Sequence, residues 1–146
     1  MTLPQYYARE ATANDLKFAE QATDVLNAAY HTEGRDLRVV GSLLVVPFPD
    51  LEEKPTPGEA MITRFSISPA HQSKGLGSLL IKSSLETMKS AGYERCSLRV
   101  FENRHEILEW YAKLGFKDTS ERRNFKAPHG KKLLSDTKFV IMKKDI

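Results

Sequence analysis

The chain has 146 residues, a length typical of one domain, and 40% of them are hydrophobic while 28% are charged. With 8 Gly and 7 Pro, this composition excludes collagen-like, low-complexity and wholly disordered chains. The net charge of +3 arises from interspersed acidic and basic residues, so it does not indicate a nucleic-acid partner. No apolar run approaches the roughly 18 residues of a membrane helix, and the opening MTLPQYYARE lacks the order of a secretory signal.

Cysteine and histidine usage limits redox and metal chemistry. The one cysteine, Cys96, cannot form an intrachain disulfide or a cysteine-based zinc site. The 4 histidines contain no pair at metal-ligand spacing. We therefore expect a cytoplasmic protein with no metal, no membrane and no nucleic acid among its partners, and the oligomeric state is left open.

The first third of the chain is predicted to alternate strands with one helix. Residues 6–11 form a short strand in this prediction, and a helix follows from a cap at Asn14 or Thr12 to about residue 30. Residues 37–48 are apolar and β-branched, as in a buried strand, and Gly41 within them indicates a bulge or a close backbone contact. Residues 47–58 hold four prolines and are predicted to form a loop.

The remaining pattern predicts two helices and four strands. They are, in order, a strand over 59–68, a helix over 77–90, a strand around 96–100, a helix over 106–114, a weaker strand from 116 and a strand around 139–142. Cys96 alternates with Leu98 and Val100, so we expect a buried core thiol. Lys143 and Lys144 are expected to be solvated. The order predicts an α/β mixed sheet in a single domain over residues 1–146.

The segment from Phe65 to Leu80 carries the chemistry. A strand ends at Pro69, a polar loop holds Gly75 and Gly77, and a helix starts at once. Such a loop can direct several backbone N–H groups and a helix dipole at one anion, while Lys74 adds a full charge. The alternative is that the glycine pair only makes a tight turn. The spacing matches neither a P-loop nor the dinucleotide fingerprint, because the third glycine of the latter is replaced by Leu80.

The loop instead reads Q-x-x-G-x-G from Gln72 to Gly77, after an Ile-Ser-Pro step. This motif resembles that of the GNAT superfamily of acyl-CoA-dependent N-acyltransferases. The resemblance implies a mostly antiparallel sheet flanked by helices, and loop amides that bind the pyrophosphate of acetyl-CoA. It places the pantetheine arm on the backbone of Phe65 and Ile67. The remaining cofactor-binding positions that it implies are Gln72, Ser73, Lys74, Gly75, Leu76, Gly77 and Ser78.

A second block, from Asn103 to Phe116, resembles the family's N-x-x-A-x-x-[FL]-Y-x-x-x-G-F pattern, with Ile107 in place of the usual small residue. The resemblance implies that Asn103 contacts CoA, a role compatible with a helix N-cap. It also implies that Tyr111 is the catalytic proton donor to the departing thiolate. Trp110 has the spacing of a core or groove-wall residue.

The family resemblance implies an acetyl-CoA-dependent N-acetyltransferase that acts by direct attack of an amine in a ternary complex. Its general base is not identified by the pattern, and Glu59 is the nearest candidate in sequence. Only residues 31–38 separate the first helix from the Val39-Val40-Gly41-Ser42 step, so the amino-terminal half is shorter than in relatives. The alternative is therefore a catalytically inactive CoA-binding module that acts as a sensor or an assembly partner.

Overall fold

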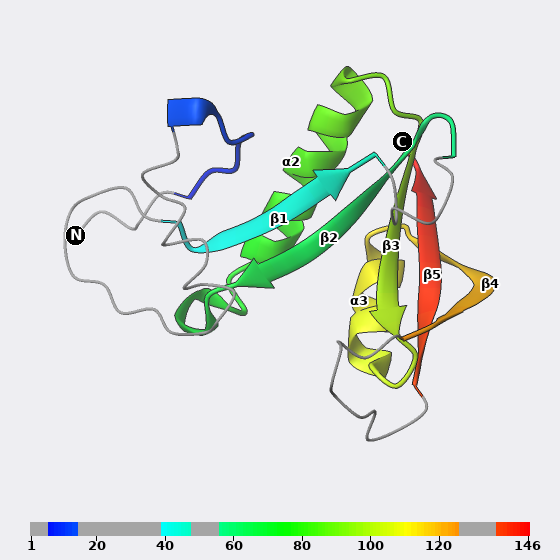
Figure 1. Ribbon diagram of the computed structural model, residues 1–146. Coiled ribbons are helices and arrows are strands. Elements are labelled where there is room, and N and C mark those ends of the chain that lie inside the picture. Colours follow the sequence, from blue (N-terminus) through cyan, green and yellow to red (C-terminus); the bar gives the residue numbers. More distant parts are fainter. Residues whose placement is uncertain (1–5, 15–38, 48–55, 126–136) are drawn as a thin grey trace, which may run out of the picture. The chain divides into compact units, whose positions relative to one another are not determined.

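The computed structural model describes residues 6–14, 39–47, 56–125 and 137–146 (Figure 1). Within them lie two α-helices, five strands and a 3-10 turn: β1 (Gly41–Val46), β2 (Glu59–Ile67), η2 (Pro69–His71), α2 (Leu76–Ser90), β3 (Arg95–Phe101), α3 (His105–Lys113), β4 (Lys117–Asn124) and β5 (Lys138–Asp145). The predicted α/β fold with a mixed, mostly antiparallel sheet is confirmed. No helix in these ranges is long and apolar enough to cross a membrane.

The five strands form one sheet in the order β1-β2-β3-β5-β4. β2 and β3 are parallel and pair over three positions, from Glu59 opposite Arg95 to Met61 opposite Ser97. β3 and β5 are antiparallel and pair along their whole seven-residue overlap. β4 lies at the outer edge against β5, and its register shifts between Asp118 and Arg122. Two sequence-distant strands, β3 and β5, therefore form the most regular ladder.

The chain divides into two compact units. The first contains residues 1–46 and 62–92, and the second contains residues 47–61 and 93–146. In the first unit, α2 buries one apolar face that includes Leu76, Ile81, Leu85 and Met88. In the second, consecutive residues at the centres of β3 (96–98) and β5 (140–142) are buried, and so is Tyr111 of α3. The expected single domain over residues 1–146 stays a prediction.

Glycines and a lysine define the helix ends. Gly92 follows α2 with a φ of 93°, and Gly115 follows α3 with a φ of 97°, a conformation that side chains disfavour and that stops a helix. Lys144 in β5 donates from Nζ to the carbonyl of Leu114 at 2.7 Å, which satisfies a group at the carboxyl end of α3. The expectation that Lys144 is merely solvated was wrong, because this carbonyl lies within its reach.

Two predictions about the amino-terminal part need correction. Residues 6–12 form no strand in the structure, since an extended segment becomes a strand only with a pairing partner, and Tyr7 is 59% exposed. Tyr6 instead packs edge-on against His71, with 6.1 Å between ring centroids. The strand predicted over residues 37–48 is shorter, and Gly41 starts it. The predicted helix over 14–30 and the segment 31–38 lie almost wholly outside the described residues.

The close contact predicted at Gly41 is confirmed. A Cβ at this position would lie 2.5 Å from Cδ1 of Ile67 and 3.2 Å from the backbone oxygen of Ser66. The first distance is far below van der Waals contact and the second is slightly below it. A side chain at position 41 therefore requires the end of the Ile67 side chain to move and the Ser66 backbone to shift by a few tenths of an ångström.

We expect Gly41→Ala to lower the free energy of unfolding by about 1–3 kcal/mol, because it overpacks this contact. Adding Ile67→Val should recover part of the loss, since that change removes the Cδ1 atom and leaves only the Ser66 oxygen in the way. Chemical denaturation of both variants measures the effect. Equal stability of Gly41→Ala and the wild type would show that the contact relaxes freely.

Candidate functional site

The loop between β2 and α2 is fixed by its own hydrogen bonds. The Gln72 side chain donates from Nε2 to the backbone oxygen of Ile67 at 3.1 Å, which ties the loop to the end of β2. The His71 amide donates to the Ser68 oxygen at 2.8 Å, and the Ser68 amide donates to Val40 at 2.7 Å. The loop is thus held at both the strand and the turn. Gln72, the first residue of the motif, acts here as a brace.

The amino end of α2 presents uncapped backbone donors. Its N-cap is Gly75, with a left-handed φ of 75°, and no side chain accepts a hydrogen bond there. The first intrahelical bond runs from the Leu79 amide to the Gly75 oxygen at 3.1 Å. The amides of residues 76–78 therefore precede the first intrahelical donor, and the helix dipole adds partial positive charge at the same place. This arrangement suits a phosphate group.

The charge around the loop is also positive. Lys74 is exposed between Ser73 and Gly75, whose φ values are both positive. Burial, and then the charge of Lys74, lower the pKa of His71 below its usual 6.5. His71 is therefore neutral at pH 7, and Lys74 is the full positive charge that the loop itself carries.

β2 contains a backbone feature that the sequence does not indicate. Arg64 has a φ of 51°, a left-handed value that is rare for a residue with a side chain. Phe65 and Ile67, the residues with a predicted role toward pantetheine, follow it and are half-buried. Strained backbone of this kind is concentrated at functional sites. A glycine at this position would have been the signal, and none is present.

Tyr111 lies in the second unit, on the buried face of α3. It is 7% exposed, and its ring packs edge-on against Trp110 and Phe116. Burial, and then the nearby Cys96, raise its pKa from 10 to about 12. The phenol is therefore fully protonated at neutral pH. Cys96 is 0% exposed, so the predicted core thiol is confirmed.

Asn103 is exposed in the turn between β3 and α3. The suggestion that it caps α3 was wrong, because Arg104 occupies the N-cap and the helix begins at His105, one residue before the predicted start at 106. The Arg104 guanidinium donates from Nε to Glu106 at 2.7 Å, an ion pair across the first turn. The contact of Asn103 with CoA stays a prediction.

The predicted site residues thus fall into both units. Phe65, Ile67 and the residues from Gln72 to Ser78 lie in the first, while Asn103 and Tyr111 lie in the second. The structure brings the loop residues together at the amino end of α2, in the segment that follows the end of β2. Tyr111 lies near Cys96 of β3.

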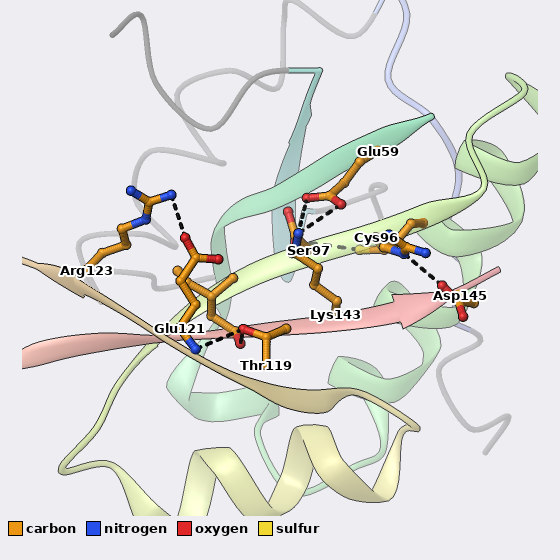
Figure 2. A network of polar contacts seen from close by, with 10 residues as sticks. Glu59, Cys96, Ser97, Thr119, Glu121, Arg123, Lys143 and Asp145 are labelled. Atoms are coloured by element: carbon orange, nitrogen blue, oxygen red, sulfur yellow. Dashed lines mark hydrogen bonds and ion pairs between the residues drawn. The ribbon is translucent and has the colours of Figure 1, made fainter. Parts of the chain in front are cut away.

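Glu59 forms an ion pair that the sequence did not reveal. Both carboxylate oxygens lie 3.1 Å from Nζ of Lys143, and the Glu59 side chain is 11% exposed (Figure 2). The predicted solvation of Lys143 was therefore wrong. The Glu59 carboxylate is therefore engaged by an ammonium group. The pair joins the start of β2 to the end of β5 across β3, and the two residues are 84 positions apart in the chain.

Comparisons with known proteins give the family and the fold. A family model described as "Acetyltransferase (GNAT) family" matches residues 2–116. The ribosomal-protein-S18-alanine N-acetyltransferase of Escherichia coli has 18% identity and a TM-score of 0.58, and the match covers 77% of this chain and 65% of that one. A putative GNAT acetyltransferase of Desulfovibrio desulfuricans has 17% identity and a TM-score of 0.59, with 77% and 64% covered.

A Bacillus subtilis acetyltransferase solved in complex with CoA has 16% identity and a TM-score of 0.59, with 75% of this chain and 70% of that one covered. No curated protein sequence matches this chain. The chain spans slightly less than two thirds of the length of the Escherichia coli and Desulfovibrio desulfuricans proteins. At these identities the likeness establishes the fold.

The raised pKa of Tyr111 gives a testable pH dependence. The folded pKa of about 12 exceeds the ordinary value of 10, so the stabilisation is complete below pH 10 and is lost as the pH rises from 10 to 12. Over that interval the wild type should lose roughly 2–3 kcal/mol more unfolding free energy than Tyr111→Phe, which has no ionisable hydroxyl. Denaturant unfolding at several alkaline pH values, with pH 8 as the common baseline, measures the difference. If the unfolding free energies of the two proteins fall equally with rising pH, the phenol is not buried.

Proposed function

The chain belongs to the GNAT acetyltransferase family, and on this basis we propose that it transfers an acetyl group from acetyl-CoA to an amine. The transfer proceeds by direct attack in a ternary complex. The observation that carries the proposal is the uncapped amino end of α2, which follows Lys74 and Gly75 in the chain. It offers the donors and the charge that a CoA pyrophosphate requires.

Binding of acetyl-CoA uses the first unit for the phosphates. In this proposal the pyrophosphate accepts hydrogen bonds from the amides of Gly77 and Ser78, while Lys74 supplies the charge. Gln72 keeps the loop in place through its bond to Ile67. The backbone around Phe65 and Ile67 binds the pantetheine arm, and Asn103 adds a contact from the second unit.

The chemical step begins with a neutral amine, because a protonated amine has no lone pair with which to attack. A lysine-like ammonium with a pKa near 10.4 must first lose a proton. The nitrogen then attacks the thioester carbonyl, and backbone N–H groups near Ile67 stabilise the oxyanion. Collapse of the intermediate breaks the C–S bond and leaves the CoA thiolate.

Tyr111 donates to this thiolate in the proposal. A thiol with a pKa of about 8.5 is a stronger acid than a phenol at about 12. The Tyr111 hydroxyl therefore stabilises the sulfur chiefly by a hydrogen bond. If Tyr111 does transfer its proton, the proton released by the amine replaces it. Net transfer moves one proton from nitrogen to sulfur and leaves Tyr111 unchanged.

A thiol-release assay with acetyl-CoA and a panel of amines tests the activity. Release that depends on both the amine and acetyl-CoA, with an N-acetylated product in mass spectrometry, supports the proposal. Binding of acetyl-CoA without thiol release from any amine would instead identify a CoA-binding module.

Gly75→Val tests the phosphate loop. We expect acetyl-CoA affinity to fall at least about tenfold, because the added side chain projects into the open space over the loop amides. Gly92→Val is the matched control: its φ is also positive, its Cβ also meets nothing within 4 Å, and it lies at the other end of α2. Titration calorimetry on both variants separates loop blockage from backbone strain. Equal losses in the two variants would contradict the assignment.

Tyr111→Phe tests the proton donor. The ring contacts with Trp110 and Phe116 are kept while the hydroxyl is removed, so the fold and the acetyl-CoA Kd should barely change. Loss of a positioned general acid lowers kcat by about 10²–10⁴-fold. Single-turnover kinetics isolates the chemical step. An unchanged chemical rate would remove Tyr111 from the mechanism.

A further inference from the structure

The carboxyl end of α3 closes on the backbone of Tyr111. The Leu114 amide donates to the Tyr111 oxygen at 3.0 Å, and the Phe116 amide donates to the same oxygen at 3.1 Å. The Gly115 amide donates to the Ala112 oxygen at 3.0 Å. The last two of these bonds, together with the positive φ of Gly115, form a Schellman motif, a common helix ending. Tyr111 is thus the residue on which the ending of α3 converges.

The same ending places the Tyr111 ring. Phe116, which follows the glycine, is 2% exposed, and its ring packs edge-on against the Tyr111 ring with 5.6 Å between centroids. An apolar contact between these two positions often accompanies a Schellman motif. α3 has nine residues, about two and a half turns, and Tyr111 belongs to the last of them. Fraying of this end therefore moves the Tyr111 ring together with its backbone.

Lys144 of β5 completes the ending from outside the helix. Its Nζ donates to the carbonyl of Leu114 at 2.7 Å. Leu114 is the C-cap residue of α3, a position whose carbonyl has no intrahelical donor. The ammonium also lies at the carboxyl end of the helix dipole, where a positive charge is favourable. Because Lys144 is paired with Cys96 in the β3–β5 ladder, this bond joins the end of α3 to the sheet.

The Lys144 side chain packs closely over Gly115. A Cβ at position 115 would lie 3.1 Å from Nζ and 3.2 Å from Cε of Lys144. A side chain there would shift the end of the lysine by a few tenths of an ångström. Gly115 therefore has two roles, because it supplies the positive φ and leaves open the path by which Lys144 reaches Leu114.

We infer that Lys144 is a positioning residue, which holds the last turn of α3 and thereby the Tyr111 hydroxyl in place for proton donation. The inference rests on the proposed function, in which Tyr111 is the donor to the departing thiolate. A displacement of about 1 Å at a reacting group lowers the rate by up to about a hundredfold. Loss of the lysine bond should therefore affect the chemical step and leave acetyl-CoA binding unchanged.

Amide hydrogen exchange of the full chain without substrate tests the hold on α3. Lys144→Met keeps most of the apolar stem and removes the ammonium. We expect the Gly115 and Phe116 amides to exchange at least about tenfold faster, while amides at the centre of β3 change less than about twofold. Unchanged exchange at Phe116 overturns the inference. An equal acceleration in β3 also overturns it, because that result indicates a loss of global stability alone.

Two further variants serve as controls for this measurement. Lys138→Met removes the same charge from an exposed position of β5 and should leave exchange at Phe116 as in the wild type. Lys144→Arg keeps a charged donor and should retain most of the protection at Phe116. Equal acceleration by Lys138→Met and Lys144→Met would show a general charge effect and overturn the inference.

Single-turnover kinetics connects the helix end to the reaction. With acetyl-CoA and an amine that the thiol-release assay identifies, Lys144→Met should lower the chemical rate at least about tenfold without changing the acetyl-CoA Kd. In the Tyr111→Phe background the same substitution should change the rate less than about twofold, because the hydroxyl that the lysine positions is absent. A further loss of about tenfold in that background shows that Lys144 acts independently of Tyr111 and overturns the inference.

The two measurements separate the inference from the proposed function. If no amine gives thiol release with the wild type, the acetyl transfer is contradicted. The exchange experiment needs neither acetyl-CoA nor an amine, so it decides by itself whether Lys144 holds the end of α3.

Discussion

The parallel pairing of β2 with β3 is the constraint that ties the start of β2 into the sheet of the second unit. It extends over only three positions, from Glu59 to Met61, and the rest of β2 belongs to the other compact unit. Through its first residues this strand holds Glu59 against Lys143 in the second unit. Through its last residues it holds the loop before α2 in the first unit, where the Ile67 oxygen accepts from Gln72.

The elements with a clear hydrophobic period were predictable from the sequence. β2, α2, β3 and α3 lie within one or two residues of their predicted bounds, because alternating or helical apolar positions coincide with burial there. The first strand was not predictable, since residues 6–11 have the pattern of a strand but no pairing partner among the residues that the structure describes. A local sequence pattern does not show whether the tertiary structure places a neighbouring strand beside the segment.

The site was predictable only in part, and for a similar reason. The glycine and glutamine spacing indicated the loop because its function depends on local backbone geometry. The Glu59–Lys143 pair was not predictable, since it joins residues 84 positions apart. The left-handed φ of Arg64 was equally hidden, because its residue type gives no sign of it. The N-cap of α3 differed by one residue, where the helix begins after Arg104 rather than after Asn103.

The electrostatics of the two units differ in a way that matters for the proposed chemistry. In the first, burial and then the charge of Lys74 lower the pKa of His71, and Lys74 supplies the positive charge of the loop. In the second, Tyr111 keeps its proton because its ring is buried, and no cation near it is needed. The phenol that the proposed reaction uses as a donor is therefore protonated throughout the neutral pH range.

The outer strand β4 has a consequence for how molecules of this protein meet one another. All eight of its residues are exposed, and five of them are charged: Lys117, Asp118, Glu121, Arg122 and Arg123. Asp118 accepts two hydrogen bonds from Arg122, at 2.9 and 3.0 Å, where the register shifts. Such a strand is a poor template for a neighbouring chain, because an added strand would meet clustered charge and an irregular backbone. Self-association through sheet extension, and with it amyloid-like aggregation, is disfavoured at this edge.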